Sequence, residues 1–550
     1  MKRRKIALLI TLAGLLVLSG CAAKEVNQNR EEQNMQEEVT KKPEATATAT
    51  PTATAAPTAT PTPVDEYAAL FKGIDKVRNS KGILDNNPLM TQRFGADPYA
   101  LVYDDTLYIY MTGDVPEYDA NGELKDNTYG KITTINVIST KDMVNWTDHG
   151  TIYAAGRDGA AKTANNSWAP AATWKMIDGK PKFFLYFANN GSGIFVLTSD
   201  SPTGPFTDPL GTELVSRRTP TCAAVPWLFD PAVFVDDDGS AYLYFGGGVP
   251  KDKPDHPYSA RVVKLGDDMI SLDGDPVAID PPYLFEDSGI HKMGDTYYYT
   301  YSSNFSVTSA GTKEYGLKNG EICYMTSDSP MGPFTYQGVI LPNPAEFFGT
   351  GGNNHHCVFN FRGDWYITYH AQSIVDRLGY RAGSGYRSTH IDKLAINEGG
   401  TLGRTKGTRT GVEQDGYLNP YETVEAETMW NSAGITTTQL GEQSVACGSG
   451  NMAVCGMETG SWLALRGVDF GEKGATEMIA SVCGGAEEGV IQIRIDRLMG
   501  DIVGYFTIPA GDGVTYTEQA GKLLETVTGV HDVYFTFYGS GYSMDTWKFR

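Results

Sequence analysis

Three carboxylates, a tryptophan and a histidine recur at one position of a fivefold sequence repeat. They are Asp97, Trp168, Asp230, Glu286 and His355, aligned to about one residue. Two carboxyl groups facing each other across a pocket can hydrolyse a glycosidic bond: a protonated acid assists the leaving oxygen, and an ionised base activates water. A third carboxylate can keep the acid protonated, because like charges disfavour ionisation. The cluster alone leaves open which carboxylate plays which part.

The elements that must position these residues are short strands. Each copy runs from a polar or acidic residue into an apolar strand, then through a turn with Asp or Gly, and on into a strand carrying Tyr or Phe at alternate positions. Each copy has room for about four strands, as in a propeller blade. Five copies predict a five-bladed β-propeller, in which equivalent positions converge at one mouth of the central funnel.

The motifs at these positions resemble glycoside hydrolase family 43. They are Asp97-Pro98, Trp168-Ala169-Pro170, Asp230-Pro231, Glu286-Asp287-Ser288-Gly289 and Asn353-Asn354-His355-His356. Family 43 enzymes are five-bladed propellers that invert the anomeric carbon. The resemblance implies that Asp97 is the general base, Glu286 the general acid and Asp230 the residue that tunes and orients the acid. It predicts carboxyl groups of Asp97 and Glu286 about 6.5–9.5 Å apart.

The same resemblance suggests roles for three further residues. Trp168 would line the sugar pocket, His355 (rather than His356) would bind an axial structural calcium, and Arg387 would reach the sugar hydroxyls. Each has a structural alternative: core packing for Trp168, a buried hydrogen-bonded histidine for His355, and a surface ion pair for Arg387. The run of three acids at 236–238 is interpreted as a hairpin turn rather than a metal site.

A second all-β domain follows the propeller. Its alternating strands predict a β-sandwich of the jelly-roll type over 422–550. The opening Glu-Ala-Glu, the Gly-Ser-Trp segment at 460–462 and the chain end resemble carbohydrate-binding module family 6. The resemblance implies a second structural calcium, held by Glu425, Glu427 and Asp545, and a core position for Trp462. Gly456 and Met457 replace the usual stacking aromatic and leave Tyr516, so sugar binding in that cleft stays open.

The N-terminal segment predicts export. A basic start, an apolar run over 6–18 and Leu-Ser-Gly-Cys resemble a lipoprotein signal peptide (1–21), with lipid attached to Cys21 at the membrane. Residues 22–65, which are polar and then rich in Thr, Ala and Pro, are expected to form a disordered linker. The propeller is expected over 66–421. Six other cysteines show no zinc spacing and are expected to be mostly free and buried, with a Cys447–Cys455 bridge as the alternative.

Composition narrows the partners. The chain has 550 residues and a net charge of −21, from 45 Lys and Arg against 66 Asp and Glu. Such a chain is a poor partner for nucleic acid or anionic lipid. The expected function is an inverting α-L-arabinofuranosidase that removes side chains from arabinoxylan, a plant cell-wall polysaccharide. The alternatives are a β-xylosidase, an enzyme with both activities, or a non-catalytic glycan-binding lipoprotein.

Overall fold

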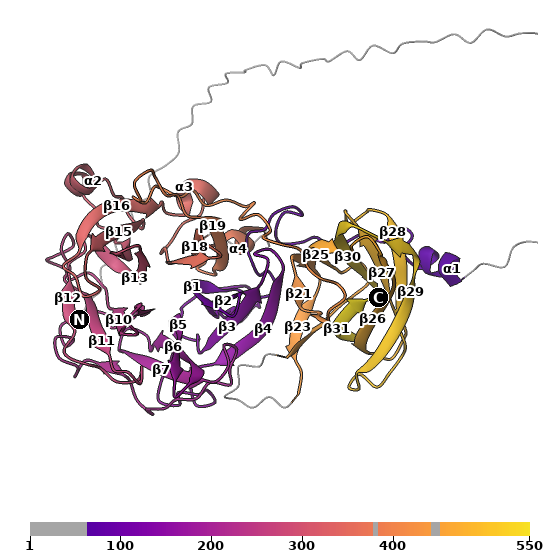
Figure 1. Ribbon diagram of the computed structural model, residues 1–550, viewed down its shortest axis with the longest axis horizontal. Coiled ribbons are helices and arrows are strands. Elements are labelled where there is room, and N and C mark those ends of the chain that lie inside the picture. The colour runs from indigo at the N-terminus through magenta and orange to yellow at the C-terminus, as the bar shows by residue number, and fades with distance from the viewer. Residues whose placement is uncertain (1–62, 378–382, 442–450) are drawn as a thin grey trace, which may run out of the picture. The chain divides into compact units, whose positions relative to one another are not determined.

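The structure is a computed structural model that describes residues 63–377, 383–441 and 451–550 (Figure 1). The predicted signal peptide with Cys21, most of the predicted linker, and Cys447 lie outside these ranges. Within them, no helix is both long and apolar enough to cross a membrane. Four short helices occur in the described ranges: α1 (Pro63–Leu70), α2 (Ser309–Tyr315), α3 (Ala345–Phe348) and α4 (Ser373–Arg377). Helix α1 thus begins inside the segment predicted as linker.

Five antiparallel sheets surround a common centre, which confirms the predicted five-bladed propeller (Figure 1). Four sheets have at least four strands and the fifth has three. From the innermost strand outward, blade by blade, they are β1 (Ala96–Tyr103), β2 (Thr106–Thr112), β3 (Thr134–Thr140), β4 (Trp146–Tyr153); β5 (Trp168–Ile177), β6 (Lys180–Ala188), β7 (Gly193–Ser199), β8 (Val215–Ser216); β9 (Ala232–Val235), β10 (Ala241–Phe245), β11 (Ala260–Leu265), β12 (Val277–Ile279); β13 (Leu284–Met293), β14 (Thr296–Ser303), β15 (Ile322–Ser327), β16 (Thr335–Leu341); and β17 (His356–Phe361), β18 (Asp364–Ala371), β19 (Ser388–Lys393).

The innermost strands close a ring. β1 contacts β5, β5 contacts β9, β9 contacts β13, β13 contacts β17, and β17 contacts β1. Their apolar side chains pack with the Tyr and Phe residues of the second strands, since alternate residues of a strand point to opposite faces. The tight turn after β9 comes from Asp236–Asp238, as expected: the Asp236 N–H donates to the Ser240 carbonyl at 2.8 Å. The predicted residues therefore meet at one end of this ring.

Four residues at the starts of the inner strands have a left-handed backbone. They are Asp97 (φ 48°), Ala169 (φ 43°), Asp230 (φ 48°) and Asp287 (φ 69°). Asp tolerates this region better than most residues, whereas Ala does not, so the geometry is imposed by the fold. Equivalent positions are therefore Ala169 in blade 2 and Asp287 in blade 4. Trp168 and Glu286 precede them by one residue, within the tolerance of the sequence alignment.

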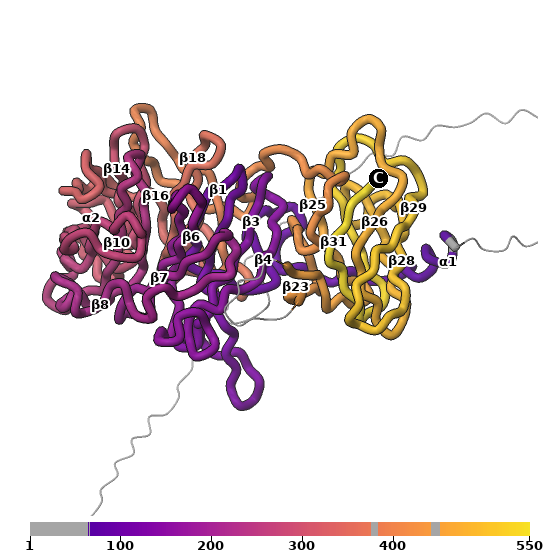
Figure 2. The backbone as a smooth tube through the Cα atoms, turned by 60° about the horizontal axis from the view of Figure 1, so that its bottom comes forward, coloured from indigo at the N-terminus to yellow at the C-terminus, as the bar shows by residue number. Residues whose placement is uncertain are grey.

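The C-terminal module is a β-sandwich, as predicted. Figure 2 shows its chain (orange to yellow) passing back and forth as antiparallel strands. These pair in the order β22-β25-β30-β27-β28-β29-β26-β31-β24-β23, with β20 beside β31. The strands are β20 (Val424–Glu425), β21 (Thr428–Met429), β22 (Asn431–Ala433), β23 (Thr436–Gln439), β24 (Met452–Cys455), β25 (Trp462–Asp469), β26 (Ala475–Cys483), β27 (Gly489–Ile495), β28 (Ile502–Ile508), β29 (Thr517–Val527), β30 (Val530–Tyr538) and β31 (Ser543–Phe549). Trp462 is buried, as expected of a core residue.

Strand β21 joins the sheet of blade 1, where Thr428 and Met429 pair with Thr147 and Trp146 of β4. The indole of Trp430 donates to Asn86 at 2.8 Å. The five described cysteines (Cys222, Cys323, Cys357, Cys455 and Cys483) are free, and all but Cys455 are buried. This agrees with the prediction of mostly free thiols.

Candidate active site

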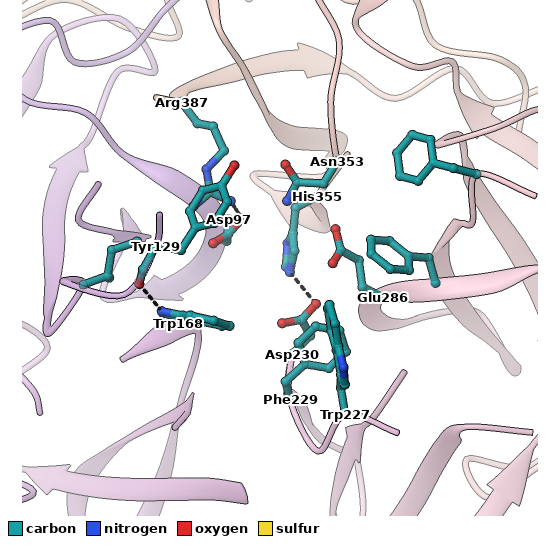
Figure 3. Close-up of a pocket in the computed structure, with 13 residues that line it drawn as sticks. Asp97, Tyr129, Trp168, Trp227, Phe229, Asp230, Glu286, Asn353, His355 and Arg387 are labelled. Atoms are coloured by element: carbon teal, nitrogen blue, oxygen red, sulfur yellow. Dashed lines mark hydrogen bonds and ion pairs between the residues drawn. The ribbon is translucent and has the colours of Figure 1, made fainter. Parts of the chain in front are cut away.

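One pocket collects all six of the predicted propeller residues: Asp97, Trp168, Asp230, Glu286, His355 and Arg387 (Figure 3). Its volume is about 330 Å³. Asp97 and Glu286 lie on opposite sides, and Asp230 and His355 lie between them. Seven further residues complete the lining: Tyr129, Ile132, Trp227, Phe229, Phe285, Phe305 and Asn353.

Asp97 is a buried carboxylate held in its ionised form. Its Oδ1 accepts a hydrogen bond from Nη1 of Arg387 at 2.7 Å. Burial alone would raise the pKa of Asp97, but the positive charge of Arg387, together with smaller contributions from His355 and His370, holds it well below its usual range. Within the described residues, the contacts found for the Asp97 carboxylate, to Arg387 and His370, all involve Oδ1.

Glu286 is held in the opposite state. It is buried, and its Oε1 has no hydrogen-bond partner among the described residues. Burial, and then the nearby carboxylate of Asp230, raise the pKa of Glu286 well above its usual range. One carboxyl group that stays ionised and another that keeps its proton are what acid–base hydrolysis of a glycoside requires.

Asp230 connects these acids to the propeller axis. Its Oδ2 accepts the backbone N–H of Asp287 at 3.0 Å and lies 3.5 Å from Nε2 of His355. Burial raises the pKa of Asp230, and His355 partly opposes that shift. A carboxylate in this position raises the pKa of Glu286 by charge repulsion without bonding to it.

Asp287 lies beside both histidines of the axial motif and is hydrogen-bonded to His356 but not to His355. Its Oδ1 lies 2.9 Å from Nδ1 of His355, and its Oδ2 lies 2.5 Å from Nδ1 of His356. Burial lowers the pKa of His355, but the carboxylates of Asp287 and Asp97 raise it well above its usual range. The sequence does not identify Asp287 as a site residue. This residue stands next to Glu286 in the motif, and nothing in the sequence distinguishes a role for Asp287 from that of its neighbour.

Arg387 is buried in a carboxylate clamp. Its Nε and Nη2 donate to both oxygens of Asp114, at 2.9 and 2.8 Å, while Nη1 reaches Asp97. The alternative of a surface ion pair is therefore wrong. Two of the three nitrogens are committed to Asp114, which the sequence did not single out. The side chain also stacks under Tyr129, with the guanidinium carbon 5.0 Å from the ring centroid.

A long loop over 113–133, between β2 and β3, forms one wall. The indole of Trp168 donates to the carbonyl of Tyr129 at 3.0 Å, so this loop orients Trp168. The loop itself is fastened by Glu117, whose Oε1 accepts the N–H and the hydroxyl of Thr128 at 3.0 and 2.6 Å. Tyr129 lies outside the strand repeat, which explains why the repeat did not reveal it.

Aromatic side chains form the opposite rim. Trp227 packs edge-on against Phe229 at 5.0 Å, and Phe285 packs edge-on against Phe305 at 5.8 Å between ring centroids. Trp227 is 44% exposed and Phe305 is 50% exposed, which is unusual for side chains of this size. Apolar ring faces beside a polar pocket suit the faces of sugar rings.

The three acids predicted to bind calcium in the module have buried carboxylate oxygens without partners, although Glu427 is buried as a residue and Glu425 and Asp545 are half-buried. Oε2 of Glu425, both carboxylate oxygens of Glu427 and Oδ1 of Asp545 have no hydrogen bond among the described residues. Burial raises the pKa of Glu427 to about 9, and repulsion from Glu425 adds to it. No group of three or more acidic, histidine or cysteine side chains in the described ranges stands at metal-binding spacing as the chain now lies.

The module cleft that could bind sugar has few aromatic side chains. A cavity of about 460 Å³ includes Tyr516, Tyr542 and Gly456. The hydroxyl of Tyr516 bonds to that of Ser543 at 2.6 Å. Tyr542 is buried, so within the described part of the cleft Tyr516 offers the more exposed ring.

Comparisons with known proteins agree with this architecture. The profile of glycosyl hydrolases family 43 matches residues 86–402, and that of carbohydrate binding module (family 6) matches 425–550. An arabinoxylan arabinofuranohydrolase of Paenibacillus polymyxa is 49% identical over 84% of this chain and 74% of its own length. The one from Bacillus subtilis is 48% identical over 86% and 93%. A xylosidase/arabinosidase of Humicola insolens is 32% identical over 52% of this chain and 89% of its own.

Solved structures show the same arrangement. A crystal structure of the Bacillus subtilis family 43 arabinoxylan arabinofuranohydrolase in complex with cellotetraose has a TM-score of 0.81 at 47% identity. It covers 86% of this chain and 99% of the other. With its five-bladed propeller and the acids gathered in one pocket, the chain belongs to glycosyl hydrolase family 43 and carries a C-terminal carbohydrate-binding module of family 6.

Proposed function

We propose that this enzyme removes α-L-arabinofuranosyl side chains from arabinoxylan or its oligosaccharides. The observation that carries the proposal is that relatives named for this activity match through both the propeller and the module. The relative named xylosidase/arabinosidase matches only about half of the chain. The small pocket has room for one sugar, and its apolar rim could contact the polysaccharide chain that carries this sugar. Both features support a substrate with single-sugar side chains.

In the proposed mechanism, the configuration of the anomeric carbon is inverted in one step. Glu286 donates its proton to the glycosidic oxygen, and Oδ2 of Asp97 accepts a proton from the attacking water. The opposed pKa shifts of these two groups support this assignment. Asp230 keeps Glu286 protonated, while Trp168 contacts the sugar. Arg387 holds Asp97 and presents its edge to the pocket.

Proton NMR of the enzyme with wheat arabinoxylan tests the proposal. Arabinose appearing first as the β-anomer would support it. Arabinose appearing first as the α-anomer would contradict inversion, and xylose appearing first would favour the β-xylosidase. Glycan binding without released sugar would favour the non-catalytic alternative, in which Glu286→Ala would leave binding intact.

We also propose structural calcium in the module. Unpartnered buried carboxylate oxygens support a cation there, because calcium prefers oxygen ligands and would offset the repulsion among Glu425, Glu427 and Asp545. At the propeller axis the support is weaker. His355 offers one nitrogen, which a hard cation does not favour, and its ring lies between two carboxylates that favour a proton.

Attachment to the membrane through Cys21 completes the proposal. Fractionation of cells should place the protein with the membrane, and Cys21→Ala should release it. A separate experiment tests whether the module cleft binds sugar. Binding of arabinoxylan is compared between the inactive Glu286→Ala variant and the same variant that also carries Tyr516→Ala.

A further inference from the structure

Adjacent blades are linked by hydrogen bonds around the pocket mouth. In four places, the backbone N–H at the start of an inner strand donates to a side chain of the preceding blade. Asp97 donates to Nδ1 of His370 at 3.1 Å, Ala169 to Oγ1 of Thr112 at 2.9 Å, Asp287 to Oδ2 of Asp230 at 3.0 Å, and His356 to Oδ2 of Asp287 at 3.1 Å. Three of these donors have the left-handed backbone noted above.

We propose that His370, through Nδ1, is the positioning residue that holds the strained backbone of Asp97 and so aims its carboxylate at the attacking water. The proposal rests on the function proposed for Asp97. His370 lies on β18 of the last blade and is almost fully buried. It does not line the pocket, so it acts through Asp97 rather than on the sugar.

The hydrogen bonds of His370 define which nitrogen carries the hydrogen. The N–H of Asp97 points at Nδ1, so Nδ1 is an acceptor without a hydrogen. Nε2 therefore carries the hydrogen and donates it to the carbonyl of Asn353 at 3.0 Å. Oδ1 of Asp97 also lies 3.1 Å from Nδ1. The hydrogen bond that this oxygen accepts comes from Arg387 and not from His370.

This arrangement fixes Asp97 from two sides. His370 holds its backbone, and Arg387 holds one of its carboxylate oxygens, which leaves Oδ2 for water. A residue with φ near 48° is under strain and keeps that geometry only when its surroundings impose it. Losing the bond to His370 would let the peptide of Asp97 relax and move the base away from the line of attack.

Two isosteric variants separate the bonds. In His370→Asn, the amide oxygen can occupy the place of Nδ1 and keep the bond to Asp97. In His370→Gln, the amide nitrogen can occupy the place of Nε2 and keep the bond to Asn353 but not the one to Asp97. We expect His370→Asn to retain kcat within about threefold and His370→Gln to lower kcat by about 10- to 100-fold, since a misplacement near 1 Å can cost that much. KM should change little in either.

Thr112→Val is the matched control. It removes the same kind of bond in the neighbouring blade, at Ala169, away from the base. It should lower Tm about as much as His370→Gln while keeping kcat. Equal loss of kcat in both His370 variants, or an unchanged kcat in His370→Gln, would overturn the proposal.

Two further measurements keep the test decisive. If His370→Gln does not fold, as judged by circular dichroism, His370→Ala serves as the variant without an acceptor. In an Asp97→Asn background, His370→Gln should cost no further kcat, because both changes act on one group. Rates are measured on whichever aryl glycoside, arabinofuranoside or xyloside, the unmodified enzyme cleaves. A wrong sugar assignment therefore does not decide the role of His370.

Discussion

Glu286 and Asp97 are both buried carboxyl groups, yet their surroundings move their pKa values in opposite directions. Burial and Asp230 raise the pKa of Glu286. At Asp97, Arg387, His355 and His370 together outweigh burial and lower the pKa. Separating two pKa values in this way assigns the acid and the base to different residues. The same two environments lead to predictions about leaving groups and about pH.

Glu286→Gln should impair hydrolysis of arabinoxylan far more than hydrolysis of 4-nitrophenyl arabinofuranoside. The nitrophenolate leaves without a proton, so it does not need the acid, whereas a xylan hydroxyl does. We expect a loss of about 10²–10⁴-fold in kcat on the polysaccharide. Asp97→Asn should impair both substrates alike, and Asp238→Asn, in an exposed turn, should impair neither. Steady-state kinetics on both substrates measures the contrast, and equal losses in Glu286→Gln would contradict its role as the acid.

The pH profile of kcat/KM on an arabinoxylo-oligosaccharide should be a broad plateau. Asp97 must be ionised, and its lowered pKa keeps it so well below the usual carboxyl range. Glu286 must be protonated, and its raised pKa keeps it so well above that range. Activity therefore falls on the alkaline side as the pH rises through the pKa of Glu286, and on the acid side only at a pH low enough to protonate Asp97. Arg387→Lys should raise the pKa of Asp97 and so move the acid limb to higher pH. Lysine keeps the positive charge but loses the guanidinium geometry that binds Asp97 and Asp114 together. An unmoved acid limb in this variant, with folding verified by circular dichroism, would contradict the pairing.

At the scale of elements, the inner strands and the loops between blades contribute differently to the pocket. The starts of three inner strands, β1, β9 and β13, bring the carboxyl groups proposed for catalysis. The loop over 113–133 brings Tyr129 and the hydrogen bond that orients Trp168. The sequence repeat therefore predicted Asp97, Asp230 and Glu286, because repeated strands carry them. It could not predict Tyr129 or Asp114, since their places depend on loop conformation. The left-handed backbone at Ala169 and Asp287, which shows that these residues are equivalent to Asp97 and Asp230, also becomes visible only in the structure.

The loop over 113–133 should behave as one unit fastened by Glu117. Glu117→Ala removes two hydrogen bonds to Thr128 and should loosen Tyr129 and, through it, Trp168. We expect kcat/KM to fall about tenfold, mainly through KM, since losing such bonds costs about 1–3 kcal/mol. Lys125→Ala, which touches the same carboxylate only at 4.0 Å, is the control and should have little effect. Unchanged KM in Glu117→Ala would show that the loop does not orient the sugar pocket.

At the scale of the whole molecule, the acids of the module lie where it joins blade 1. Glu427 is the residue before β21, which pairs with β4, and its carbonyl accepts the N–H of Asp148 in β4. Asp148 is itself buried and paired with Arg93, and it accepts the hydroxyl of Thr437 from the module at 2.7 Å. Electrostatic repulsion among the module acids therefore bears on the attachment of the module as well as on its own fold.

Calcium should therefore stabilise the whole enzyme and not only the module. Without a cation, Glu427 has a pKa of about 9 and so keeps its proton at neutral pH. Calcium binding must displace that proton. Calcium affinity should consequently rise with pH. We expect added calcium to raise Tm by several degrees over protein treated with EDTA, since binding to the folded state alone adds about 3 kcal/mol at a hundredfold excess over Kd. Glu427→Gln should abolish the response, while Glu422→Gln, an exposed acid nearby, should keep it. Calorimetry that shows the same Tm with calcium and with EDTA would argue that these buried carboxyl groups are neutral and need no metal.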